Sequence, residues 1–240
     1  MKLVTPDVPR RTMGLPLCCV TAALLASGSG PAWGDRPLTS ETADVIEQGQ
    51  CQVEANHAVA RTRGSPKLQS SDVTASCGID GRTQLALGGV STRGGGIRLT
   101  TQFLAGKTTL LKPEPDRTGW GVAYRLDRTR MEGSSAHTER SALTALATRE
   151  LTPTLLAHAN LGWTRERMAR QNTTTWSLGV ETVGSFTIAA DVFGDDRSKP
   201  AISAGVGWAL NNVFSINAVA GVQTEQPRTT TFGIGMKIVF

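Results

Sequence analysis

Apolar and polar residues alternate along most of this chain, and the alternation is clearest in the last twelve residues, 229–240. From Phe232 to Phe240 every second residue is apolar, and the residues between them are small or polar apart from Val239. A period of two indicates a β-strand whose two faces meet different surroundings. At the edge of a soluble sheet such a strand would invite aggregation. In an outer-membrane barrel it would pair on both sides and turn its apolar face to lipid.

The same alternation recurs in eleven earlier segments. We predict twelve strands, at 50–61, 71–79, 82–92, 96–107, 118–129, 139–149, 154–165, 173–182, 185–194, 200–210, 213–223 and 229–240. The 194 residues from position 47 onward provide about sixteen residues for each strand and its connection. That length suits tilted strands of roughly ten residues that cross a bilayer.

Some segments alternate cleanly and two do not. The apolar positions of 155–163, 202–210 and 214–222 fall on one phase throughout. Near 96–107 and 139–149 the phase changes or blurs, which predicts a β-bulge or another register irregularity there.

The connections between the predicted strands also alternate in length. Long polar stretches such as 129–137 and 224–228 follow odd-numbered strands, and tight turns such as 79–81 and 211–212 follow even-numbered ones. Only the connection around 112–116 departs from this rule. Short periplasmic turns, longer extracellular loops and both termini on the short-turn side are typical of outer-membrane barrels.

These patterns predict an all-β fold, an antiparallel transmembrane β-barrel of about twelve strands closed by pairing 229–240 with 50–61. A secreted β-sandwich is the soluble alternative, and it would need the apolar faces to pack against each other. The different lengths of the turns and loops favour the barrel. Four aromatic residues are predicted to mark its two rims: Trp163 and Trp176 near the loop at 165–171, and Trp208 and Phe240 near the opposite rim.

The first 34 residues have the features of a secretory signal peptide. Lys2, Arg10 and Arg11 give a positive start, residues 13–26 are uncharged, and a pattern of small residues suits cleavage before Asp35. The uncharged run is too short for a stable membrane anchor. The Arg10-Arg11 pair suggests twin-arginine export, but that route carries folded proteins. We therefore predict a signal peptide at 1–34, a periplasmic N-terminal segment at 35–46 and a barrel at 47–240, located in the cell outer membrane.

Composition excludes several other classes of protein. Removal of the predicted signal takes away three cationic residues and one acidic residue and lowers the net charge from +5 to +3. No basic cluster follows a groove, so nucleic-acid binding is not expected. Only 39% of the residues are hydrophobic and 26 are Gly, which suits short alternating strands better than a helical core.

Cys51 and Cys77 are the two cysteines of the predicted mature chain. Their mean position falls in the middle of the loop at 61–67, so an antiparallel hairpin that turns there places them opposite each other. Because the compartment is oxidising, we predict a cross-strand disulfide. A metal or redox pair is the alternative, and no third or fourth ligand accompanies it.

Charged residues on the inward phase are predicted to form a lumen network. They carry both signs, and they are Glu54, Arg125, Asp127, Glu181, Asp191 and Lys237. The interior of a barrel of about twelve strands is narrow. Such side chains either pair and fill it, which gives a plugged structural barrel, or they line a thin aqueous path.

An outer-membrane lipid-modifying enzyme of the phospholipase type is the catalytic alternative. Its serine hydrolase chemistry needs a histidine, and the mature chain offers His57, His137 and His158. His137 lies in a loop with Ser134 and Ser135, and no nucleophile is evident beside His57 or His158, although a triad can assemble from distant strands. We therefore expect a protein without catalytic residues, cofactor or metal.

The stretch after the predicted signal resembles a family of bacterial outer-membrane β-barrels that are grouped with the phenol meta-pathway degradation proteins and described as transporters. The resemblance rests on 36–54, on Cys77 with 82–85, and more weakly on 160–163, 194–197 and the last two strands. The family's Thr-Asp-Asp-Ala after Arg-Pro is only partly kept in 39–43. The resemblance implies a lipid-embedded barrel that passes a small-molecule cargo. The terminal strand ending in Phe240 also resembles the signal that barrel-assembly machinery recognises.

Overall fold

The computed structural model describes residues 38–134 and 137–240. The predictions for the signal peptide at 1–34 lie outside the described residues. The described residues contain no helix long and apolar enough to cross a membrane.

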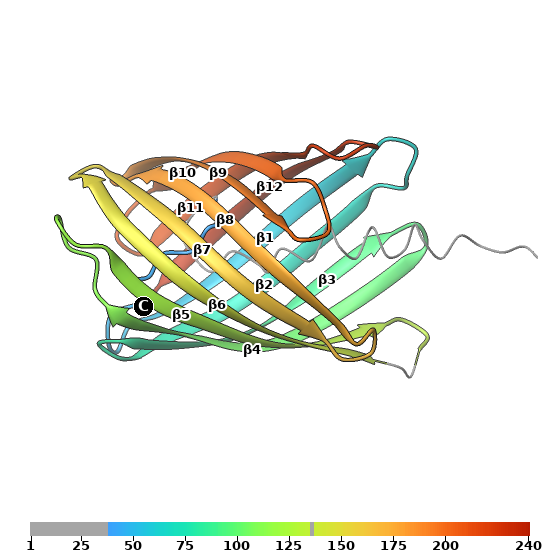
Figure 1. The fold of residues 1–240 in the computed structure, drawn as a ribbon, viewed down its shortest axis with the longest axis horizontal. Coiled ribbons are helices and arrows are strands. Elements are labelled where there is room, and N and C mark those ends of the chain that lie inside the picture. The colour runs from blue at the N-terminus through green and yellow to red at the C-terminus, as the bar shows by residue number, and fades with distance from the viewer. Residues whose placement is uncertain (1–37, 135–136) are drawn as a thin grey trace, which may run out of the picture. The chain divides into compact units, whose positions relative to one another are not determined.

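Twelve antiparallel strands close into a barrel (Figure 1). The strands are β1 (Cys51–Thr62), β2 (Leu68–Asp80), β3 (Thr83–Gly94), β4 (Ile97–Leu111), β5 (Gly119–Met131), β6 (His137–Thr152), β7 (Leu155–Glu166), β8 (Gln171–Thr182), β9 (Phe186–Asp195), β10 (Ala201–Ala209), β11 (Phe214–Gln223) and β12 (Thr229–Val239). Each strand pairs with the next in sequence, and β1 pairs with β12. The predicted fold class, strand number and closing pair are confirmed.

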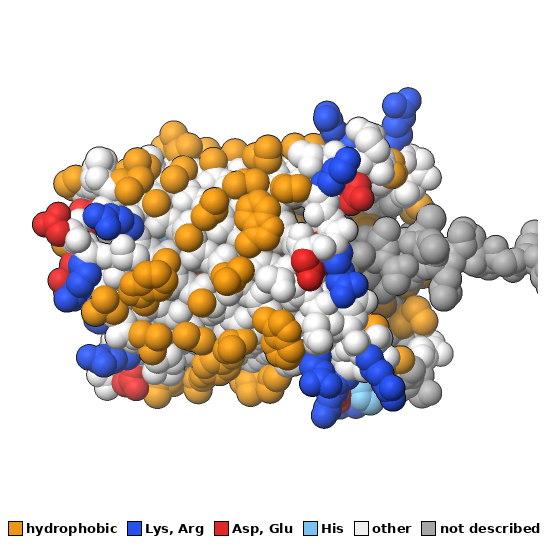
Figure 2. Space-filling view, in the orientation of Figure 1, with side chains coloured by type: hydrophobic (Ala, Val, Ile, Leu, Met, Phe, Trp, Pro, Cys, Tyr) orange, Lys and Arg blue, Asp and Glu red, His pale blue; other side chains and the backbone are white. Residues whose placement is uncertain are grey.

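The outward wall is apolar and exposed. Leu126, Leu161 and Phe232, for example, keep 58%, 61% and 58% of their surface accessible. Figure 2 shows the resulting belt of hydrophobic side chains, with charged side chains gathered at its two ends. Because this face is not packed against a second sheet, the belt excludes the sandwich and suits a wall surrounded by lipid.

The start of β1 and the end of β12 lie at the same end of the barrel, where the Cys51 N–H donates a hydrogen bond to the Phe240 carbonyl at 2.8 Å. We call this end, with the connections that follow even-numbered strands, the turn end, and the opposite end the loop end. The difference in connection length is smaller than expected, because the strands run on into the loops. The connection between β3 and β4 is only 95–96, and the longest connection, 112–118, lies at the turn end.

The blurred alternation at 96–107 and 139–149 does not come from the predicted bulge. Phe103 on β4 and Leu146 on β6 point inward and are buried, beside outward-facing Leu104 and Leu143. Apolar residues therefore occupy both faces there, and the alternation is lost in the sequence. The register does shift on these strands, but beyond the predicted segments, at Thr109/Leu111 and Glu150/Thr152.

Candidate functional site

Residues 38–48, which we call the inner segment, lie against the inner wall near the turn end. It contains residues 38–46, the described part of the predicted N-terminal segment at 35–46, and extends two residues beyond it. Leu38, Ser40 and Ala43 are buried, although the stretch has no regular secondary structure beyond a single bridge of Gln48 to Gly78. Along its length, the inner segment contacts the strands of the wall in order from β9 down to β2. The inner segment therefore occupies part of the lumen instead of preceding the barrel.

Asp191 on β9 holds the beginning of the inner segment. Its Oδ2 accepts hydrogen bonds from the backbone N–H of Thr39 at 2.6 Å and of Ser40 at 3.0 Å. Its Oδ1 accepts one from the Ser203 hydroxyl on β10. On β8, a Cβ at Gly179 would lie 2.7 Å from the Ser40 hydroxyl oxygen, so the close approach requires glycine there.

The middle of the inner segment is held by β7 and β6. With its amide oxygen facing the donor, Asn160 accepts from the Glu41 N–H at 2.6 Å and donates to the Glu41 carbonyl at 3.1 Å. The Thr148 hydroxyl accepts from the Ala43 N–H at 2.8 Å. The backbone polar groups of this irregular stretch thus find partners in wall side chains, as buried backbone requires.

His158 lies behind Thr148 in the wall. Its Nδ1 is 3.0 Å from the Thr148 hydroxyl, and its Nε2 is 3.1 Å from Glu181 Oε1. A carboxylate, an imidazole and a hydroxyl in this order are the groups that hydrolytic triads use. Here the hydroxyl contacts Ala43 and its neighbour Thr42, at 3.4 Å, so the three groups support the inner segment.

The end of the inner segment meets β4, β3 and β2. The Thr109 hydroxyl donates to the Ala43 carbonyl at 2.7 Å, and Lys107 Nζ lies 3.3 Å from the Thr42 carbonyl. Gln84 Oε1 accepts from the Ile46 N–H at 2.9 Å. The chain then passes so close to Gly78 that a Cβ there would collide with the Glu47 carbonyl.

A second buried charged group lies on β5 and β6. Asp127 bridges two arginines: Oδ1 is 2.6 Å from Arg125 Nε, and Oδ2 is 2.9 Å from Arg140 Nε. The Arg125 guanidinium also stacks over the Phe103 ring at 3.7 Å. The three charges thus form a connected network on the inner wall.

The structure places the predicted lumen residues as follows. Glu54, Arg125, Asp127, Glu181 and Asp191 are buried on the inner wall. Lys237 is half-buried on the same face, directly opposite Glu54 in the register of β1 and β12. Arg125 and Asp127 contact each other, Glu181 contacts His158, and Asp191 holds the inner segment.

Five further inward-facing groups were not predicted from the sequence: Lys107, Thr109, Thr148, Gln84 and Arg140. Most of these residues lie on β4 and β6, where the alternation blurs, so the strand phase did not indicate which way they face. No periodic signal marked the inner segment at all. Its conformation depends on the wall that surrounds it.

The four predicted rim aromatics all lie on the outward phase. Trp163 is 44% exposed, Trp208 54% and Phe240 70%, and Trp176 is half-buried against the backbone of Gly194. Trp163 and Trp176 lie toward the loop end, and Trp208 and Phe240 toward the turn end. Interfacial anchoring by these side chains remains a prediction.

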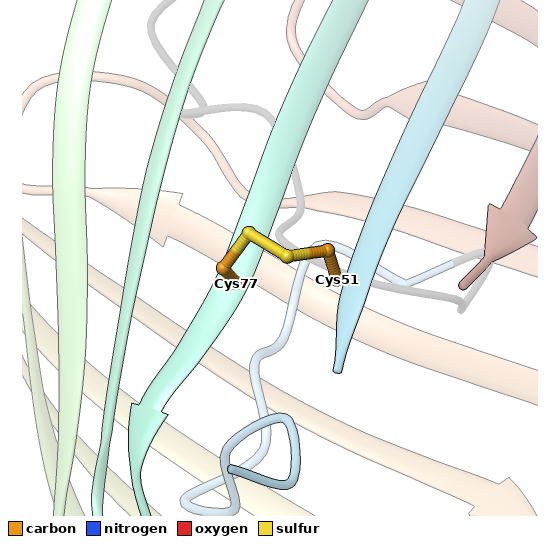
Figure 3. The surroundings of a disulfide bond; sticks show 2 residues. All are labelled: Cys51 and Cys77. Carbon is orange, nitrogen blue, oxygen red and sulfur yellow. A yellow bond between two sulfur atoms is a disulfide. The ribbon is translucent and has the colours of Figure 1, made fainter. Parts of the chain in front are cut away.

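Cys51 and Cys77 form a disulfide between β1 and β2 at the turn end (Figure 3). The two residues are directly opposed in register, with Cα atoms 4.1 Å apart. The predicted cross-strand bridge is present in the structure. The disulfide joins β1 to β2 close to the point where the inner segment leads into β1.

His57 differs from the other histidines because it faces outward. Its Nδ1 lies 2.8 Å from the Ser71 hydroxyl on β2, and both residues are exposed. His137 is at the loop end, where its Nε2 is 3.6 Å from Glu139. Ser71 was not predicted as a neighbour of His57, although the register that opposes Cys51 to Cys77 also opposes these two residues.

A closed barrel of twelve antiparallel strands with an apolar outer wall and polar groups inside defines the class of outer-membrane β-barrels. The chain belongs to the family described as "Uncharacterised conserved protein UCP029691", which matches residues 22–240. No curated protein matches its sequence.

Solved structures with this fold include the COG4313 outer membrane channel from Pseudomonas putida F1. It has a TM-score of 0.60 and 10% identity, and the match covers 82% of this chain and 98% of that one. The KdgM porin in complex with disordered oligogalacturonate has a TM-score of 0.58 and 9% identity over 79% of this chain and 99% of the porin. Outer membrane phospholipase A from Escherichia coli has a TM-score of 0.50 and 8% identity over 85% and 93%. At these identities the likeness establishes the fold.

Proposed function

We propose that this protein is an outer-membrane barrel that passes small molecules through a narrow lumen without catalysis. One observation carries the proposal: a closed barrel has an apolar outer wall and an inner wall bearing Glu54, Arg125, Glu181 and Asp191. Charged side chains are costly to bury away from water, and an aqueous path beside them would lower that cost.

The inner segment sets the width of the proposed passage near the turn end. It is held by hydrogen bonds to single side chains such as Asp191, Thr148 and Gln84. The passage therefore narrows to the space that the segment leaves beside the opposite wall. We expect it to select small solutes by size, with Lys237 and Glu54 among the charges that line it.

Two further considerations support passage over a purely structural role. The motifs at 36–54 resemble barrels grouped with the phenol meta-pathway proteins and described as transporters. Among structures with the same fold, one is titled an outer membrane channel and another a porin. Export by the segment at 1–34 and insertion by assembly machinery that reads the strand ending in Phe240 belong to the same proposal.

The test is a planar-bilayer recording of the refolded protein. We expect discrete conductance steps of small amplitude, smaller than those of a porin with an open lumen. A change of electrophoretic mobility on heating serves as the control for a folded barrel. Folded protein that gives no conductance would contradict the passage and favour a plugged structural barrel.

Hydrolysis of lipid esters is the second candidate, and the pair of His57 and Ser71 favours it. In this chemistry His57 Nδ1 accepts the Ser71 proton while Oγ attacks an ester carbonyl, and the leaving alcohol takes the proton back. Water then releases the acyl group from Ser71 in the same way. A phospholipase assay comparing the wild type with Ser71→Ala tests it, and activity unchanged by the substitution would reject this pair.

A further inference from the structure

The outward wall carries a cluster of arginines at the loop end of β3, β4 and β5. It consists of Arg93, Arg98, Arg128 and Arg130, all exposed, and we call it the arginine patch. These residues lie on the outward face of their strands, which is apolar nearer the middle of the barrel. On β5 the outward positions change from Leu126 directly to Arg128 and Arg130. The patch therefore borders the apolar belt instead of lying in the lumen or on a loop tip.

Two members of the patch lie directly opposite each other on neighbouring strands. Arg93 and Arg98 are directly opposed in the register of β3 and β4, joined by the turn at 95–96. Like charges at directly opposed positions destabilise a sheet. Two guanidinium groups in this arrangement match a doubly charged oxyanion such as phosphate, to which arginine binds through paired hydrogen bonds.

Two acidic residues lie beside the patch and leave it positive. Arg98 is 3.9 Å from Glu132, and Arg128 is opposite Glu139 in register. Glu139 also accepts a hydrogen bond from Arg167 at 2.6 Å. The four arginines thus share two carboxylates, one of which is already bound by a further arginine.

The neighbouring outward positions on β1 to β4 are polar instead of apolar. His57, Ser71, Ser91 and Thr100 follow one another across the register of these strands. Toward the turn end the wall becomes apolar again at Leu85, Leu87 and Leu104. A polar and cationic band above an apolar surface is the arrangement that a lipid with a phosphorylated headgroup would cover, with its acyl chains below.

We infer that the arginine patch binds the phosphate groups of a lipid headgroup in the leaflet at the loop end. The occupant is a lipid with two phosphates on one headgroup, because the four arginines form two pairs, Arg93 opposite Arg98 across β3 and β4, and Arg128 with Arg130 two residues apart on β5. This inference does not depend on passage through the lumen. A barrel that conducts nothing would carry the same site.

Native mass spectrometry of the refolded barrel with added lipids tests the site. The probes are diphosphorylated lipid A, the same glycolipid without phosphates, and phosphatidylcholine. We expect the wild type to retain diphosphorylated lipid A at least tenfold more than the other two. Replacement of all four arginines by glutamine should remove most of that preference. As a control, Arg82→Gln with Arg149→Gln, which removes two exposed arginines at the turn end, should keep it.

Heat-dependent mobility shows that each variant is folded before its lipids are compared. Inorganic pyrophosphate separates a lipid site from a general anion site. A lipid site should hold lipid A against millimolar pyrophosphate, because the acyl chains add to the affinity. Equal lipid A retention by the patch variant and the control would overturn the inference. So would displacement by pyrophosphate to the level seen with the phosphate-free glycolipid.

Discussion

Two parts of the inner wall differ, a crowded half from β3 to β9 and a small-residue half from β10 to β12, and β1 and β2 lie between them. From β3 to β9 the wall carries large buried side chains, including Lys107, Arg125 and His158, and it holds the inner segment. From β10 to β12 its buried inward positions include Ser203, Gly207 and Gly233, with Lys237 as the one long charged side chain among the described inward residues of these three strands. One half therefore provides the ligands for an irregular segment, and the other leaves room. We expect the proposed passage to run along β10 to β12.

Removal of the inner segment from the crowded half should change the conductance more than any of the substitutions below. A mature protein that lacks residues 38–46 should conduct several-fold more current than the wild type in planar bilayers, because the crowded half then faces an open lumen. Asp44→Ala with Glu47→Ala, at exposed positions of the segment, is the control and should conduct as the wild type does. Unchanged conductance of the folded deletion variant would show that the segment does not limit the passage.

The disulfide joins β1 to β2, which lie between the two halves, at the turn end. Replacement of Cys51 and Cys77 by serine should lower the free energy of unfolding by about 3 kcal/mol, because the bridge closes a loop with a sequence separation of 26. Urea denaturation of the refolded barrel measures the change. Reduction of the wild type by a thiol should lower its urea midpoint as much as the two substitutions do. It should leave the midpoint of the double variant unchanged. Mass spectrometry that finds both thiols free would exclude the bridge.

Asp191 is the anchor whose loss should free the inner segment without removing it. Asp191→Ala deletes the acceptor for the Thr39 and Ser40 N–H groups, and hydrogen bonds to a charged group contribute about 1.5–3 kcal/mol each. We expect faster proteolytic cleavage within the segment and brief openings to a larger conductance. Asp72→Ala is the matched control, because Asp72 bonds Asn56 within the wall at 2.9 Å. Equal effects of the two substitutions would assign them to general destabilisation.

The small-residue half is tested by filling it. Gly207 faces inward, and a Cβ there would lie 3.6 Å from the nearest heavy atom, an ordinary contact, so Gly207→Leu starts its side chain without a clash. We expect conductance to fall by about a third to a half if the passage runs along this half, an estimate that assumes one leucine side chain in a narrow lumen. Gly89→Leu makes the same change on the outward phase of β3, where the nearest atom is 3.5 Å away. It should leave conductance unaltered.

Much of the barrel was accessible from the sequence because strand phase is a local property. Phe232, Ile234 and Met236 mark one face of β12 without reference to any other strand, and the same rule found the other eleven. The pairing of Cys51 with Cys77 followed from the centre of one hairpin. Errors arose where the rule is not local, as at Phe103 and Leu146, which are apolar yet buried on the inner wall, Phe103 beneath the Arg125 guanidinium.

The sequence by itself therefore determined an antiparallel barrel of twelve strands, its closing pair and the inward phase of most of its charges. Only the tertiary structure decided how the inner segment is held, since its backbone takes its partners from Asp191, Thr148 and Gln84 on three separate strands. These three strands are far apart in the sequence, and they face one lumen only when the whole barrel closes.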